Sequence, residues 1–244
     1  MSGRVLITGA TSGIGRQLAL DYRRSGWQVW GCGRDGERLQ ALADEGIIPL
    51  QFDGRDSAAM AVIAADLPAL DLLILNAGNC EYMDLVEGFD GALFARVIET
   101  NLIATGHALA AFLPRLVSGS RLAIVGSSVS WLPLPRAEAY GASKAALDYL
   151  AATLRLDIAT RGIGVTLIRP GFVQTPLTAK NDFPMPCLVT VEEASRAIMS
   201  GLAAGRHQIH FPRRFIWLLR LLGALPTGLW LRLGRTLISK GSPS

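Results

Sequence analysis

The chain has 244 residues, half of them hydrophobic, which is enough for one α/β domain with a core on each face of a sheet. All 20 acidic residues lie at or before Glu193, so residues 1–193 carry a net charge of −4 and the last 51 carry +8. This slightly acidic body argues against a nucleic-acid-binding domain, and three widely spaced cysteines, Cys32, Cys80 and Cys187, argue against a metal site or a disulfide framework.

Short apolar runs alternate with longer helical patterns along the chain. Several runs are continuous, as in Leu72-Leu73-Ile74-Leu75, which is typical of strands buried on both faces. Such alternation predicts a doubly wound, Rossmann-like α/β fold with a seven-stranded, mainly parallel sheet and helices on both faces. The predicted strands are Arg4–Thr8, Gln28–Cys32, Ile47–Phe52, Asp71–Asn76, Arg121–Gly126, Gly164–Arg169 and Gln208–Phe211, and the predicted helices lie near 14–25, 37–45, 56–66, 89–116, 138–160 and 191–204.

The domain limits follow from the same pattern. We expect residues 1–212 to form one domain and residues 213–244 to form an apolar, basic helical extension that is not an independent domain. No apolar leader precedes the first strand, and no stretch approaches the ~20 apolar residues of a membrane-spanning helix. With its unpaired cysteines, the chain is therefore expected to be cytoplasmic.

The first predicted strand runs into a glycine-rich turn that opens the first helix. The glycines are spaced G-x-x-x-G-x-G rather than G-x-G-x-x-G. Glycine lets the backbone approach a pyrophosphate, and the free N–H groups of the following helix favour an anion. Glycine-rich turns also occur without a ligand, but the place between strand and helix favours a dinucleotide site. The candidate residues are Gly9, Thr11, Ser12, Gly13, Ile14 and Gly15.

The second predicted strand leads into Gly33-Arg34-Asp35. An acid near this point binds the ribose 2′-hydroxyl of NAD, whereas an arginine suits the 2′-phosphate of NADP. We therefore take Arg34 as the residue that selects NADP. The adjacent Asp35 keeps NAD possible, and an exposed arginine at the start of a loop is the plainer interpretation.

Tyr140 and Lys144 share one face of a predicted helix, because they lie four residues apart. An ammonium near a phenol favours the phenolate and so lowers the pKa of the tyrosine. A phenol tuned in this way exchanges a proton with a carbonyl or alcohol oxygen. Upstream, Ser127-Ser128 end a strand-like run, where a hydroxyl can bind a substrate oxygen.

The ordered motifs resemble the classical short-chain dehydrogenase/reductase family over roughly residues 4–211. They are Thr8-Gly9-x-x-x-Gly13-x-Gly15, Asn76-Ala77-Gly78, Asn101, the serine pair, Tyr140-x-x-x-Lys144 and Pro170-Gly171. The resemblance implies an NADP(H)-dependent oxidoreductase acting on a small carbonyl or alcohol substrate, in a homodimer or homotetramer.

The resemblance also implies roles for single residues. Tyr140 is the expected general acid/base, Lys144 binds the nicotinamide ribose, Ser128 holds the substrate oxygen and Asn101 supports a proton-relay water. The expected cofactor contacts are Asp53 and Asn76-Ala77-Gly78 on the adenosine side, and Pro170, Gly171, Val173 and Thr175 at the nicotinamide.

The catalytic serine is uncertain between two neighbours. The family spacing of 13 residues before the tyrosine selects Ser127, whereas Ser128 is one residue short. The usual glycine three positions after the serine is Trp131 when the count starts at Ser128. We prefer Ser128, because side-chain alternation fixes the register at a strand end while a loop tolerates a deletion.

Two later segments bear on the substrate and on partners. Residues 172–186 contain two phenylalanines, Met185 and three prolines, a composition that suits either a cover over an apolar substrate or ordinary loop packing. Residues 213–236 combine tryptophan, leucine and arginine without any acid. They predict two short helices that contact a membrane surface, a second subunit or the active site, and similar extensions in family members hint at a lipid-like substrate.

Two other functions fit parts of the sequence. One is a non-catalytic dinucleotide-binding sensor or scaffold attached through its basic tail; the complete Ser, Tyr, Lys and Asn set argues against it. The other is a sugar-nucleotide epimerase or dehydratase of the extended branch. That branch generally has a longer substrate domain and a different glycine spacing.

Overall fold

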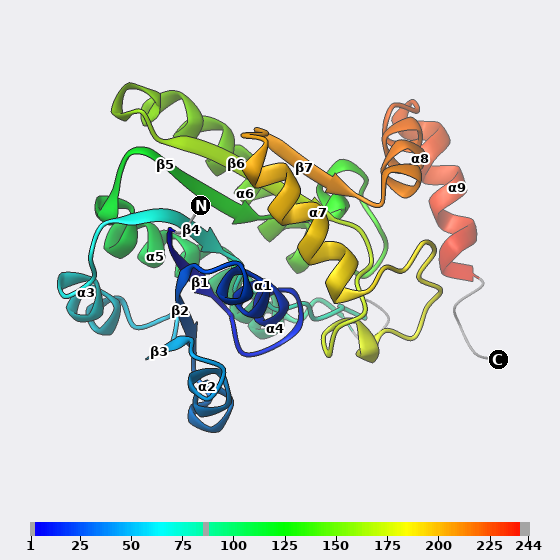
Figure 1. Ribbon diagram of the computed structural model, residues 1–244. Coiled ribbons are helices and arrows are strands. Elements are labelled where there is room, and N and C mark those ends of the chain that lie inside the picture. Colours follow the sequence, from blue (N-terminus) through cyan, green and yellow to red (C-terminus); the bar gives the residue numbers. More distant parts are fainter. Residues whose placement is uncertain (1–2, 85–87, 240–244) are drawn as a thin grey trace.

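The computed structural model describes residues 3–84 and 88–239, with side chains through Gly234. Within these residues, seven strands form one parallel sheet in the order β3-β2-β1-β4-β5-β6-β7 (Figure 1). The predicted Rossmann-like fold is confirmed. The strands are β1 Arg4–Thr8, β2 Gln28–Gly33, β3 Ile48–Gln51, β4 Leu70–Leu75, β5 Leu116–Val125, β6 Gly164–Pro170 and β7 Gln208–Phe211.

Helices cover both faces of the sheet. Residues of α1, α2 and α7 pack in one core, and residues of α3, α5 and α6 pack in the other. The strand order reverses direction between β1 and β4, which is where a doubly wound sheet opens a crevice for a ligand. The helices are α1 Gly13–Arg24, α2 Gly36–Ala43, α3 Ser57–Ala65, α4 Gly91–Ile98, α5 Ala104–Phe112, α6 Glu138–Asp157, α7 Val191–Ala203, α8 Arg213–Gly223 and α9 Thr227–Ser239.

The continuous apolar run of β4 shows why both faces need helices. Successive side chains of a strand point to opposite faces. Leu72 and Ile74 accordingly belong to the core under α1 and α7, whereas Leu73 and Leu75 belong to the core under α5 and α6. Replacing such a buried leucine by alanine costs about 2–5 kcal/mol of stability.

Two predicted boundaries are wrong. The single helix expected over 89–116 is interrupted by a π-helical turn at Glu99–Ile103, which separates α4 from α5. Strand β5 begins at Leu116 instead of Arg121, and its pairing with β4 shifts register between Leu70 and Leu72. Gly119, with φ of +88°, lies in this irregular stretch, and such a local deviation is invisible to a pattern of apolar residues.

The chain ends in two short helices, α8 and α9, which lie together beside the end of β7 (Figure 1). Phe215, Ile216 and Leu219 of α8 are buried against Leu132 in a third apolar cluster. Among the described helices, none is individually long and apolar enough to cross a membrane; α8 and the start of α9 reach that composition together, bent by 118°.

Candidate functional site

A cleft of about 820 Å³ lies at the carboxyl ends of the central strands, at the crevice expected from the strand order. The structure brings all but three of the predicted site residues to its walls; Gly15, Asn101 and Ser128 are the exceptions. The predicted residues that line the cleft are Gly9, Thr11, Ser12, Gly13, Ile14, Arg34, Asp53, Asn76, Ala77, Gly78, Tyr140, Lys144, Pro170, Gly171, Val173 and Thr175.

The glycine-rich turn forms the floor of the cleft between β1 and α1. Gly9 and Gly13 have φ of +65° and +52°, a region that side chains other than glycine rarely adopt. The Ser12 side chain makes no capping hydrogen bond, and the first turn of α1 contains no acid. The free amides at the start of α1 therefore remain available for an anion in the cleft.

Contrary to the prediction, Gly15 does not line the cleft. It is buried in α1, where an added Cβ would overlap the carbonyl oxygen of Gly9 and the side-chain amide of Asn76. Its role in the structure is to let the helix start approach the turn closely, which the spacing of the glycines did not distinguish from contact with a ligand.

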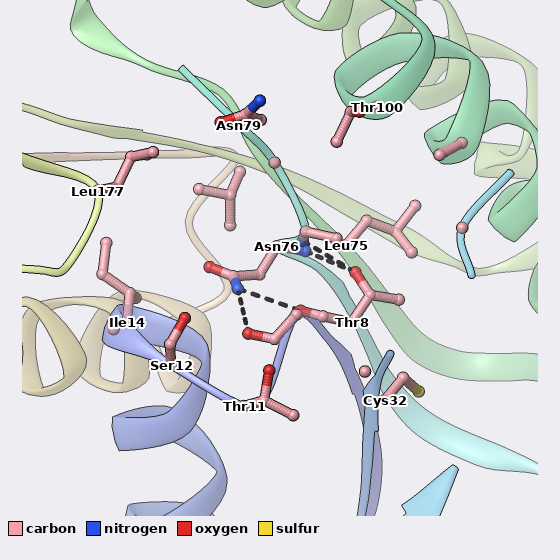
Figure 2. Close-up of a pocket in the computed structure, with 18 of the residues that line it drawn as sticks. Thr8, Thr11, Ser12, Ile14, Cys32, Leu75, Asn76, Asn79, Thr100 and Leu177 are labelled. Carbon is pink, nitrogen blue, oxygen red and sulfur yellow. Dashed lines mark hydrogen bonds between the residues drawn. The ribbon is translucent and has the colours of Figure 1, made fainter. Parts of the chain in front are cut away.

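Asn76 joins the glycine-rich turn to the end of β4. Its Nδ2 donates to the carbonyl oxygens of Thr8 and Gly9 at 3.1 and 3.2 Å, and Figure 2 shows the side chain reaching across to the turn. In return, Thr8 Oγ1 accepts hydrogen bonds from the backbone amides of Asn76 and Ala77. These four contacts fix the two loops relative to each other, so the cleft floor is held without a ligand.

Three arginines surround the far end of the cleft. Arg34, which the sequence identified, is joined there by Arg38 and Arg55. Asp53 accepts two hydrogen bonds from the Arg55 guanidinium, and these bonds lower the pKa of Asp53 to about 2. Asp35 caps α2 by accepting from the amide of Arg38 and also pairs with the Arg38 side chain.

The balance of charge at this end is positive, with three guanidinium groups facing the two carboxylates of Asp35 and Asp53. The sequence pattern identified Arg34 but neither Arg38 nor Arg55. Arg38 follows Asp35 by three residues, and Arg55 follows Asp53 by two. Both carboxylates are already bonded to arginines. The end of the cleft is thus better suited to a phosphate than to an uncharged hydroxyl.

At the opposite end, α6 presents Tyr140 and Lys144 to the cleft. The Lys144 Nζ lies 5.7 Å from the centre of the Tyr140 ring and donates to the Val125 carbonyl oxygen at 3.0 Å. Ser127, directly beyond β5, also lines the cleft, and its hydroxyl acts to lower the pKa of Tyr140. The phenol of Tyr140, the hydroxyl of Ser127 and the ammonium of Lys144 therefore line the cleft together near the end of β5.

Burial sets the ionisation of this group, contrary to the expected direction for tyrosine. Burial raises the pKa of Tyr140 above its ordinary value, and the hydrogen bond from Ser127 lowers it only in part. Burial also lowers the pKa of Lys144 to about 8, while Cys80 and Asp148 act in the opposite sense. Burial is the largest influence on the Tyr140 pKa, and it acts against the lowering that the sequence predicted from Lys144.

The structure places Ser127, not Ser128, beside Tyr140. Ser127 continues the extended path of β5, with φ of −161° and ψ of 156°, and its side chain faces the cleft. Ser128 begins a tight 3-10 turn and is buried away from the cleft. The preference for Ser128 is corrected on this geometry, because the chain turns immediately after Ser127 instead of one residue later.

Asn101 does not line the cleft, and its expected role at a proton-relay water stays a prediction. Its fully buried side chain donates to the Asn79 carbonyl oxygen and to Ser143 Oγ, and accepts from the Asn79 amide. The π-helical turn inserts this amide between the β4 loop and α6. These three contacts join Asn79, in the loop after β4, to Ser143, the residue before Lys144.

Side chains of α6, β6 and the turn after Ser127 make contacts that the sequence pattern did not indicate. Asp148, one helical turn after Lys144, accepts hydrogen bonds from Ser130 at 2.6 Å and Arg169 at 2.9 Å. Trp131 lies between two guanidinium groups, 4.9 Å from Arg169 and 4.6 Å from Arg220 of α8. These cation–π contacts connect the segment after Ser127 with α8, and no local sequence motif predicts them.

Comparisons with known proteins identify the family of this chain. A family model described as short chain dehydrogenase matches residues 4–184. An uncharacterized oxidoreductase of Myxococcus xanthus is 34% identical, covering 92% of this chain and 93% of its own. The chain belongs to the short-chain dehydrogenase/reductase family. The family prediction, and with it that of an oxidoreductase, is confirmed.

Other members of the short-chain dehydrogenase/reductase family share the fold and differ in substrate. A sulfoacetaldehyde reductase of Chromohalobacter salexigens is 34% identical, covering 73% of this chain and 75% of its own. A Burkholderia cenocepacia short-chain dehydrogenase solved in complex with NADP gives a TM-score of 0.85 at 25% identity, covering 95% of this chain and 97% of its own. A serine dehydrogenase complexed with NADP⁺ gives a TM-score of 0.77 at 28% identity, covering 85% of this chain and 94% of its own.

Proposed function

We propose that this short-chain dehydrogenase/reductase uses NADP(H) to interconvert a carbonyl compound and the corresponding alcohol. The observation that carries the proposal is that Ser127, Tyr140 and Lys144 line one end of a cleft whose other end is arginine-rich. A non-catalytic sensor is disfavoured, because it needs no proton donor beside a bound nicotinamide.

The residues of the cleft fit a dinucleotide phosphate. The uncapped start of α1 suits the pyrophosphate, and Arg34, Arg38 and Arg55 suit a ribose 2′-phosphate. The solved relatives that contain NADP or NADPH support the same choice. NAD stays the alternative, through Asp35, but that carboxylate is engaged with Arg38.

When bound, the cofactor supplies or accepts a hydride at the nicotinamide. In reduction, the hydroxyls of Ser127 and Tyr140 donate hydrogen bonds to the substrate carbonyl oxygen, and Tyr140 gives up its proton to that oxygen. The Lys144 ammonium stabilises the phenolate that remains, which favours transfer even though burial raises the Tyr140 pKa. Oxidation of an alcohol follows the reverse path.

Aromatic side chains close to Tyr140 favour a substrate with an apolar part. Phe172 and Phe183 of the loop after β6 have ring centres 6.1 Å apart, and Phe183 meets Tyr82 edge to face at 5.2 Å. Arg136 and Asp182 form an ion pair at 3.0 Å, so their charges neutralise each other. We therefore propose a lipophilic aldehyde, ketone or alcohol as the substrate. The expected homodimer or homotetramer stays a prediction, for light scattering to check.

Replacement of Tyr140 by phenylalanine tests the reaction. The phenol oxygen is the proposed proton donor, so turnover of NADPH with a panel of aliphatic aldehydes and ketones should fall by about 10²–10⁴-fold. Calorimetric binding of NADPH should persist. Tyr149→Phe is the matched control, because Tyr149 lies on the same helix with 74% exposure. Unchanged turnover in Tyr140→Phe contradicts the proposed mechanism.

A further inference from the structure

The outer side of the last two helices keeps large apolar side chains in solvent. On α8, Trp217 and Leu221 are each 68% exposed and Leu218 is 50% exposed. These residues share one face of the helix, because Leu221 lies four residues after Trp217 and three after Leu218. On α9, Leu229 and Leu231 are 45% and 53% exposed, on opposite sides of the helix. We call the three residues of α8, Trp217, Leu218 and Leu221, the outer face.

The other side of the same helices is already packed on the protein. Phe215, Ile216 and Leu219 of α8 are buried against Leu132, and the Trp230 Nε1 of α9 donates to the Pro133 carbonyl oxygen at 3.1 Å. Packing inside the subunit therefore accounts for one apolar side of the helix pair. A contiguous apolar surface that remains outside marks a contact with something else.

The charge around the outer face has one sign. Arg213 and Arg214 at the start of α8 and Arg232 of α9 are exposed, and none of the three forms an ion pair within the described part of the chain. The sequence contains no acid after Glu193. The partner of this surface must combine negative charge with an apolar layer.

We propose that the outer face docks on an anionic phospholipid bilayer. Leucine and tryptophan side chains insert at the boundary between headgroups and acyl chains, while arginines stay near the phosphates. The bend of 118° between the helices allows both to lie in the plane of the surface. Insertion as a membrane-spanning pair would strip the buried contacts of Phe215 and Ile216 from the protein, so the geometry selects surface contact.

Two other occupants fit the surface less well. A second copy docked through the same face would bring together two surfaces that carry arginines and no acid of the last helices, which is repulsive overall. A nucleic acid would match the arginines but would leave Trp217, Leu218 and Leu221 without an apolar partner. A bilayer with anionic headgroups meets both requirements.

Docking in this way bears on the proposed reaction. The inner side of α8 contacts Trp131 and Phe172, which lie in the loops that follow Ser127 and Pro170. The bilayer would therefore lie next to the loops that enclose the substrate, and a lipophilic substrate could enter from it. This consequence rests on the proposed function, whereas the docking surface itself does not.

Vesicle co-sedimentation of the full chain tests the proposal. We expect binding to vesicles that contain phosphatidylglycerol, weaker binding to pure phosphatidylcholine, and release by salt. Trp217→Ser with Leu221→Ser should weaken binding by about tenfold or more, because both side chains lose their apolar contact. The matched control is Tyr149→Ser with Leu156→Ser, two residues of α6 that are 74% and 76% exposed.

A second pair of variants tests the charge. Arg213→Gln with Arg214→Gln should weaken binding to the anionic vesicles by roughly fivefold for each arginine. Arg23→Gln with Arg24→Gln, adjacent exposed arginines of α1, should leave it unchanged. Circular dichroism of each variant establishes that the fold is retained.

The outcomes separate the alternatives. Equal sedimentation of all variants, or binding that ignores lipid charge, overturns the proposal. A dimer seen by light scattering that Trp217→Ser with Leu221→Ser dissociates assigns the face to a second copy and also overturns it. Binding to vesicles with no turnover of any carbonyl compound would reject the proposed reaction and leave the docking surface intact.

Discussion

The two ends of the cleft are held in place by different kinds of contact. At the cofactor end, short turns follow directly from β1, β2 and β4, and backbone groups such as those of Thr8 and Gly9 make the decisive contacts. At the substrate end, longer loops are joined by side chains, through Arg136 with Asp182 and Trp131 between two arginines. The first construction depends on local motifs, and the second depends on partners far apart in the sequence.

The sharpest test of the substrate end compares the two serines. Ser127→Ala removes the serine hydroxyl that lines the cleft with Tyr140 and should lower kcat/KM by about 10²–10³-fold, as expected for loss of a donor to a developing oxyanion. Ser128→Ala should change kcat/KM far less, because Ser128 does not line the cleft. Steady-state kinetics of both variants decides which serine takes part in the reaction. A larger loss of kcat/KM in Ser128→Ala would contradict the assignment of Ser127.

The cofactor end is tested through its arginines. Arg34→Ala or Arg38→Ala should weaken NADPH binding by about 10- to 100-fold, because a hydrogen bond to a charged group contributes about 1.5–3 kcal/mol. NADH affinity should change little, since NADH lacks the 2′-phosphate. Calorimetry with both cofactors measures the difference, and Arg196→Ala on α7 serves as an exposed control away from the cleft. Equal losses for NADPH and NADH would argue against 2′-phosphate recognition.

The pH dependence of reduction tests the coupling between Lys144 and Tyr140. Burial lowers the pKa of Lys144 to about 8, so its ammonium is present below that pH and is lost above it. Without the charge, the Tyr140 phenolate is less stable, and kcat/KM for reduction should fall by about tenfold per pH unit above this pKa. Lys144→Arg should remove that falling limb if the variant retains activity. A wild-type profile that stays flat through pH 9 would contradict the role.

The smallest expected effect concerns the contact between α8 and the loop after Ser127. Arg220→Ala removes one cation over Trp131, a contact that contributes about 0.5–2 kcal/mol. We expect a lower unfolding midpoint and a few-fold higher KM for a bulky carbonyl substrate. NADPH affinity should stay unchanged, because the contact lies away from the cofactor end. An NADPH affinity that falls together with the substrate affinity would show that the two ends are not independent.

The sequence predicted the cofactor end closely, because its determinants are local. Alternating strands and helices fix a parallel sheet, and a glycine-rich turn between the first strand and helix must lie at a carboxyl edge. Even there, Gly15 shows the limit of a motif. The same motif contains Gly13, which lines the cleft, and Gly15, which lets α1 pack closely against the turn.

What the tertiary structure decided is which side chains face one another across the molecule. The side-chain contacts of Asn101 and those of Trp131 each join segments tens of residues apart. Desolvation likewise depends on the assembled protein, which is why the pKa of Tyr140 rises although Lys144 lies one turn away. A linear pattern records spacing along the chain, whereas burial and long-range contacts arise when the elements pack.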